Sequence, residues 1–175
     1  NFYNPFYNLK PSAQKKITAT KFYKTKSFNA DEKTLEKKIA SILNKYDIIL
    51  PKPYYFKKTT VTENYYNNHR KNDWEITKEI ITRKYPEYQE SIIKYLDEGR
   101  IFHFGNMMIC SKEKFDNYNQ WLFSILFELE KTINIPENQY QARVFGFISE
   151  RLINLYVYHN KFKIKAVPTY KIIDF

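Results

Sequence analysis

The stretch IFHFGNMMICSKEKFDNYNQWLFSILFEL, residues 101–129, decides the fold class. Its first ten residues are mostly apolar and predict a buried strand that ends near Cys110. After this strand, apolar side chains recur every three or four residues, which predicts one long helix ending near Lys131. The apolar positions of this helix are Phe115, Tyr118, Leu122, Ile125, Leu126 and Leu129. A strand followed directly by a helix indicates an α/β or α+β protein.

The residues before this stretch show the same alternation. Asn29 or Asp31 is expected to cap a helix with one buried apolar face, formed by Leu35, Ile39, Ile42 and Leu43. Residues 46–50 then predict a short buried strand that is stopped by Pro51.

A second helical region is expected between this strand and residue 101. Thr62 is expected to cap a helix that runs to about Tyr85, where Pro86 interrupts it. Residues 87–98 predict a further helix that stops at Gly99, with Ile92, Ile93 and Leu96 pointing inward.

The C-terminal part predicts a helix over about 141–158 and a strand over 162–167. With about three strands, the predicted class is α/β, helix-rich with a few short strands. Residues 1–30 are polar, aromatic and basic without a clear period, and predict an N-terminal arm or loop. Residues 31–175 form the rest of the predicted domain.

Composition excludes several kinds of site. The chain has three glycines and neither a GxGxxG nor a GxxxxGK[ST] motif, which excludes a Rossmann dinucleotide site and a P-loop. Cys110 is the single cysteine, which excludes an internal disulfide and favours a reducing compartment. The net charge of +10 accompanies a composition rich in Asn, Ile, Lys and Tyr, as expected from an AT-rich genome. Charge alone therefore gives little support to nucleic-acid binding.

Three groups of polar residues could carry chemistry. In the first, Tyr65, His69 and Asp73 are spaced by four residues, which places them along one face of an unbroken helix, next to Trp74. An aspartate beside an imidazole can fix its tautomer, and Trp74 offers a flat surface to a sugar ring. The alternative is a solvated helix face with incidental contacts.

The second group is Gly105 and Asn106, inside the predicted strand. A buried amide needs hydrogen-bond partners, and a neighbouring glycine indicates close approach of a backbone or a ligand. Asn106 could thus meet a ligand at the strand end. The alternative is a β-bulge with a structural asparagine.

The third group lies on the predicted helix over 141–158. Arg143, Gly146, Glu150 and Asn154 share one stripe of this helix. Arg143 could bind a phosphate, and Glu150 is a candidate general base. Glycine is unfavourable within a helix, so Gly146 suggests that something packs closely there. The alternative is a solvated face with an ion pair.

Three ordered segments carry a family resemblance. They are NYYNNHRKNDWEITKEIITRKYPEY at 64–88, FHFGNMMICSKEKFDNYNQWLFSILFELEK at 102–131 and YQARVFGFISERLINLY at 140–156, preceded by YDIILPK at 46–52. Together they resemble the capsular polysaccharide synthesis glycosyltransferase family, long filed as a domain of unknown function.

The resemblance implies an incomplete GT-A-like glycosyltransferase fold and a cytoplasmic bacterial enzyme, with contact to the inner membrane left open. Such an enzyme moves a sugar, hexosyltransferase-like, from a nucleotide-sugar donor to a glycan or lipid-linked glycan in capsule or lipopolysaccharide synthesis. The family's His-Tyr-Arg-Arg-Tyr-Phe-like motif is absent, so we expect an upstream half that holds the nucleotide. An inactive remnant or carbohydrate-binding module is the alternative.

The resemblance also assigns roles to residues. Glu150 or Asp73 is expected to be the catalytic base. Six residues are expected to bind sugar or phosphate or to pair with these groups: Tyr65, His69, Trp74, Asn106, Arg143 and Arg151. No Asp-x-Asp motif occurs, so no metal ligands are assigned and the cofactor stays unknown. Nucleic acid is not expected among the partners.

Overall fold

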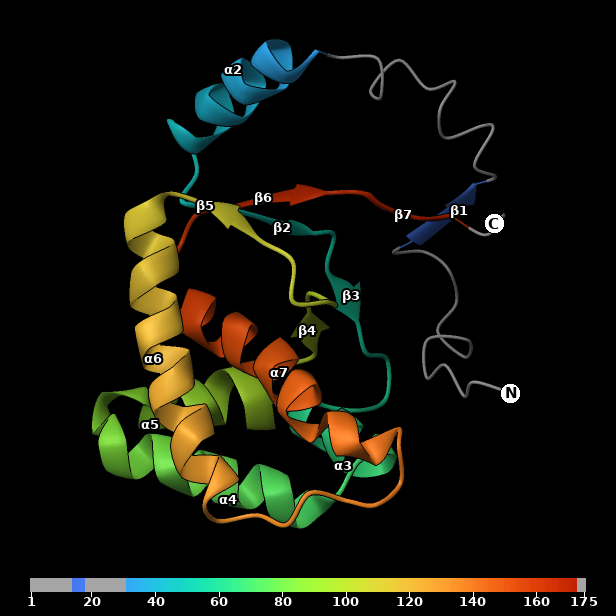
Figure 1. Cartoon of the computed structure of the whole chain (residues 1–175), viewed down its shortest axis with the longest axis vertical. Helices are drawn as coiled ribbons and strands as arrows, with labels where there is room; N and C mark the ends of the chain where they lie inside the picture. Colours follow the sequence, from blue (N-terminus) through green and yellow to red (C-terminus); the bar gives the residue numbers. More distant parts are fainter. Residues whose placement is uncertain (1–13, 18–30, 173–175) are drawn as a thin grey trace.

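The strands and helices form two layers in the computed structural model, which describes residues 14–17 and 31–172 (Figure 1). A small sheet in the order β5-β2-β6 lies along one side of a layer of helices. Its central strand β2 (Ile48–Pro51) is fully buried and pairs in parallel with β6 (Ile164–Val167). β5 (Ile109–Cys110) pairs with β2 in the antiparallel direction. The helix-rich α/β class with short strands is thus confirmed.

Two further strand pairs complete the described strands. β3 (Tyr54–Tyr55) pairs antiparallel with β4 (Ile101–Phe102), and β1 (Gln14–Ile17) pairs in parallel with β7 (Thr169–Ile172). Within the predicted arm or loop over 1–30, residues 14–17 form a strand that pairs with β7. The other residues of that range lie outside the part that the structure describes.

The helical layer is built from eight helical segments between β3 and β6. They are α3 (Val61–Asn68), α4 (Lys71–Lys84), α5 (Gln89–Ser91) with its preceding 3-10 turn η2 (Pro86–Tyr88), the π-helix η3 (Ile92–Asp97), α6 (Lys112–Glu130) and α7 (Val144–His159) with its preceding 3-10 turn η4 (Gln141–Arg143). Apart from these, α2 (Glu32–Leu43) precedes β2. Helix α7 is the most buried of them, with eleven buried residues.

The long strand predicted over 101–110 is wrong. Only its two ends pair, as β4 and β5, and residues 103–108 form a loop between them. Gly105 has a φ of +84°, a conformation that glycine adopts without strain, and it turns the chain out of the strand. The loop therefore crosses over helix α7 instead of extending the sheet.

The helix predicted from Thr62 begins two residues earlier. Thr60 is the N-cap and forms a capping box with Glu63. Thr62 is instead buried, and its hydroxyl donates to Asp97 at 2.7 Å. The helix also does not reach Tyr85 unbroken, because His69 has extended backbone angles and separates α3 from α4.

Helix α2 forms as predicted, with Asp31 as its N-cap accepting a hydrogen bond from the Thr34 backbone, but its apolar face is not buried. Leu35 is 49% exposed and no residue of α2 is buried. In Figure 1 this helix stands apart from the helical layer, so the cap and the helical pattern formed it without packing. Ile93 and Phe115, also predicted to point inward, are exposed.

Candidate active site on helix α7

Helix α7 leaves one polar stripe uncovered at its N-terminal half. Arg143 and Gly146 are exposed, while Glu150, one turn later, keeps 16% of its side chain exposed. The first turns of α7 are otherwise apolar and pack inward through Val144, Phe147 and Ile148. The polar stripe predicted from the sequence is therefore exposed at Arg143 and Gly146, and the Glu150 carboxylate on it is largely buried.

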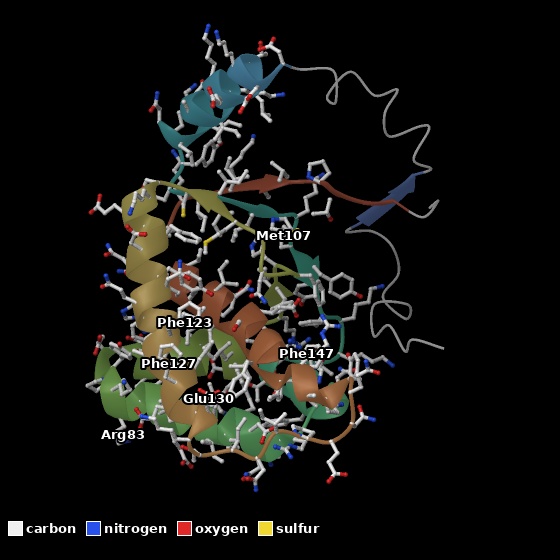
Figure 2. All side chains as sticks on the ribbon, in the orientation of Figure 1. Arg83, Met107, Phe123, Phe127, Glu130 and Phe147 are labelled. Atoms are coloured by element: carbon white, nitrogen blue, oxygen red, sulfur yellow. The ribbon has the colours of Figure 1, made fainter. Side chains whose placement is uncertain are left out.

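The loop over 103–108 covers the carboxylate side of this stripe. The Gly105 backbone N–H lies close enough to the Glu150 carboxylate to lower its pKa, and the Asn106 side chain donates to the Gly146 carbonyl at 3.2 Å. Figure 2 labels Met107, which lies on this loop, and Phe147, which lies on α7. Asn106 is exposed, so it faces the open side of the stripe.

Asn154 fastens the start of this loop to α7. Its carbonyl oxygen accepts from the His103 backbone N–H at 2.9 Å, and its amide donates back to the His103 carbonyl at 2.9 Å. The same oxygen accepts from the Tyr95 hydroxyl at 3.0 Å, and the amide also donates to the Glu150 carbonyl at 2.7 Å. Asn154 is buried, so its partners lie inside the protein and it is a structural residue.

Burial raises the pKa of Glu150 above its ordinary value, because the charged form is desolvated. Arg151, the Gly105 N–H and Arg143 act in the opposite direction and lower the pKa. A carboxylate with a raised pKa that still reaches the surface is suited to accept a proton from a hydroxyl.

Arg151 lies behind Glu150 and is buried. Its guanidinium donates to the Phe147 carbonyl at 2.9 Å and to the Asn64 side chain at 3.1 Å, and lies 3.4 Å from a Glu150 oxygen. It also sits over the ring of Tyr65 at 5.1 Å. Its Nε has no hydrogen-bond partner. With 4% of its side chain exposed, Arg151 supports the carboxylate and does not face a substrate phosphate.

The first polar group of the sequence forms part of the core. Trp74 is 0% exposed, stacks on Tyr65 with ring centroids 5.0 Å apart and donates its indole N–H to Thr62 at 3.1 Å. The prediction that Trp74 offers a flat surface to a sugar is therefore wrong, because the Tyr65 ring and Thr62 occupy the indole. Tyr65 is also 0% exposed, so it cannot touch a sugar either.

Asp73 is held in a structural ion pair. Arg70 donates to both carboxylate oxygens, at 2.8 and 2.7 Å, and to the Asn134 carbonyl at 2.7 Å. Asp73 is 2% exposed. A buried carboxylate with a bidentate arginine has no open side for a hydroxyl, so this geometry does not suit the predicted role of base.

His69 contacts both Tyr65 of the first polar group and Phe147 of helix α7. Its ring stacks on Phe147 of α7 with centroids 4.0 Å apart, and is tilted against the ring of Tyr65 with centroids 4.8 Å apart. Its Nδ1 lies 3.3 Å from the side-chain amide oxygen of Gln141. Burial and the nearby Arg151 lower the pKa of His69 to about 4, so the imidazole is neutral at pH 7. On the other side, Arg143 lies over Phe147 at 5.5 Å.

The structure thus gathers the predicted residues around α7 but separates their roles. Glu150, Asn106 and Arg143 flank the open stripe, whereas Arg151, Tyr65, His69, Asp73 and Trp74 support it from within or beside it. The contribution of the Gly105 N–H was not predicted. The glycine next to Asn106 indicated a close approach there, but the approaching group is the Glu150 carboxylate.

Among the described residues, no group of three or more His, Cys, Asp or Glu side chains could hold a metal ion. Within the same residues, no helix is long and apolar enough to cross a membrane. A separate cavity of about 520 Å³ is lined by η3, β4 and the C-terminal half of α7, including Tyr95, Ile101 and Tyr158. Neither Glu150 nor Arg143 lines this cavity.

Comparison with known proteins places these features in a family. The model of the family described as "Domain of unknown function (DUF4422)" matches residues 11–161. The fold is similar to the apo structure of WbbM, a bifunctional glycosyltransferase, with a TM-score of 0.77 and 26% sequence identity. That similarity covers 91% of this chain and 29% of the WbbM chain, so this chain spans less than a third of that protein. No curated protein matches. The resemblance predicted from the ordered motifs is confirmed.

Proposed function

We propose that this chain, which belongs to the DUF4422 family, carries the general base of a glycosyltransferase. The reaction would move a hexose from a nucleotide sugar to a growing capsular or lipopolysaccharide glycan in the cytoplasm. The similarity to WbbM supports the reaction class. One observation carries the assignment to a residue: the Glu150 side chain is only 16% exposed, lies beside Arg151 at 3.4 Å and still reaches an open stripe.

In the proposed step, a hydroxyl oxygen of the acceptor attacks the anomeric carbon of the donor sugar. The bond from that carbon to the phosphate oxygen breaks, and the nucleotide leaves with the electron pair. Glu150 takes the proton of the attacking hydroxyl, which is the role of the base in an inverting transfer. The raised pKa of Glu150 brings it closer to that of a useful base at neutral pH.

Other residues of the stripe would hold the substrates. Arg143 is exposed and has five donors in a planar fork, so we assign it to the phosphate of the donor. Asn106 keeps its carbonyl oxygen as an acceptor for a sugar hydroxyl, since its amide donates to Gly146. Arg151 and His69 act by positioning, through Glu150 and Phe147.

The test is Glu150→Gln in the full-length protein, with nucleotide release from UDP-, GDP- and CMP-sugars as the readout. We expect turnover to fall about 10²–10⁴-fold, the usual contribution of a general base. Asp73→Asn is the matched control, because it makes the same chemical change in a buried ion pair. Near-normal turnover of the Glu150→Gln protein would contradict the assignment.

Two measurements separate this proposal from its rival. Calorimetry with the same nucleotide sugars reports donor binding, and the nucleotide-release assay reports turnover. A full-length protein that binds a glycan but turns over no donor would be a carbohydrate-binding module. Turnover that depends on Glu150 would exclude that reading.

A further inference from the structure

We infer that the bare backbone at Gly146 is the floor on which a sugar ring of the substrate lies. This inference rests on the proposed function and adds a substrate contact to it. It follows from a comparison of the three glycines of the chain, all of which the structure describes.

Two of the three glycines are required by the chain itself. At Gly99 a Cβ atom would lie 2.1 Å from the Tyr95 carbonyl oxygen, a contact with backbone that cannot be relieved by a side-chain movement. At Gly105 the φ of +84° favours glycine over residues with a side chain. Both positions therefore have an internal reason to lack a side chain.

Gly146 has no such reason. It is helical, and a Cβ atom built on it would meet none of the residues that the structure describes within 4 Å. The sequence had suggested close packing at this position, and the structure shows open space instead. Alanine would favour the helix more than glycine does. What glycine preserves here is room next to the backbone that none of the described residues fills.

The groups around this room indicate the class of molecule. Glu150 lies one turn after Gly146 and offers a carboxylate that accepts hydrogen bonds. Asn106 bonds to the Gly146 carbonyl and keeps an amide oxygen as a second acceptor. Arg143, just before Gly146 on the stripe, offers donors. A small apolar floor with acceptors and donors at its edge suits a ring that carries several hydroxyl groups, which is a sugar.

The experiment compares Gly146→Ala with the wild type in the full-length protein. Nucleotide sugars of the UDP, GDP and CMP classes are the donors, and free monosaccharides and short oligosaccharides are the acceptors. We expect the melting temperature to rise by about 2–4 °C, because alanine is the better helix former. We expect kcat/KM to fall at least tenfold, mainly through KM, because the methyl group takes up the space of the ring.

Asn117→Ala is the matched control. Asn117 is exposed within α6, and its replacement also improves helix propensity but leaves the α7 stripe unchanged. This variant should show a similar rise in melting temperature and an unchanged kcat/KM. A higher melting temperature alone would then not account for the loss in Gly146→Ala.

Two results would overturn the inference. One is a kcat/KM for Gly146→Ala equal to that of the wild type. The other is a lower melting temperature for this variant, which would show that the chain itself packs against Gly146. If the wild type transfers no sugar, the proposed function fails separately. Binding of the same oligosaccharides by saturation-transfer NMR then decides, since equal binding by wild type and Gly146→Ala would overturn the inference.

Discussion

Two polar stripes of this protein both have the three- or four-residue spacing of one helix face, yet they have opposite places in the fold. The stripe through Tyr65, His69 and Asp73 closes into the core, whereas the stripe through Arg143, Gly146 and Glu150 stays open. The first closes because the helix breaks at His69 and Trp74 then stacks on Tyr65. In the second, α7 continues unbroken through Gly146 and Glu150, and the loop over 103–108 covers only the carboxylate side, so Arg143 and Gly146 stay exposed. Spacing shows which side chains share a face, but not whether that face meets water.

The largest expected effect concerns the closed stripe. Trp74→Ala should lower the free energy of unfolding by about 3–5 kcal/mol, because it removes a fully buried ring and leaves a cavity. Urea denaturation followed by circular dichroism measures this change. Turnover per folded molecule should stay close to that of the wild type. A stable Trp74→Ala protein with lost turnover would mean that the indole contacts the sugar after all.

A smaller loss is expected when the ion pair of the closed stripe is weakened. Asp73→Asn should lower the free energy of unfolding by about 1–3 kcal/mol, because the buried amide replaces a charged acceptor of two Arg70 hydrogen bonds. The same denaturation assay measures it. Comparison of this variant with Glu150→Gln separates stability from catalysis. Asp73→Asn should lose mainly stability, and Glu150→Gln should lose mainly turnover.

The smallest effect is a pH dependence at the boundary of the two stripes. The pKa of His69 is lowered to about 4 in the folded protein, so the unfolded chain binds a proton more readily. Stability should therefore be complete above the ordinary pKa of histidine, near pH 6.5, and should fall as the pH drops toward 4. Because His69 is partly exposed, we expect this loss to be about 1–2 kcal/mol.

His69→Gln isolates this contribution from those of His103 and His159, whose pKa values burial also lowers. The difference in unfolding free energy between wild type and variant should change between pH 7 and pH 4. A constant difference over this range would show that His69 binds its proton as readily in the folded protein as in the unfolded chain.

Much of the helical layer could be predicted from the sequence. The apolar period over 115–129 located α6, and the run around Ile48, Ile49 and Leu50 located the buried central strand. These features depend on local periodicity, which the sequence displays directly. The order of the motifs likewise identified the family.

The rest depended on contacts between distant residues. The sequence did not show that Gly105 turns the chain out of its strand, or that its N–H meets Glu150 forty-five positions later in the chain. It also could not show that Arg70 forms an ion pair with Asp73, because the spacing between them fits both a free and a paired carboxylate. The apolar face of α2 had the correct period, yet no neighbouring element among the described residues buries it.

The hydrogen bonds of Asn154 and Asn106, with the Gly105 N–H near Glu150, have a mechanical consequence. They fasten the loop over 103–106 to helix α7 at its start and at its tip. Loop and helix are therefore joined at two points of the loop. The positions of Glu150 and Asn106 relative to each other are set when the chain folds. The entropy cost of ordering this pair is therefore part of folding and does not reduce the affinity for a substrate.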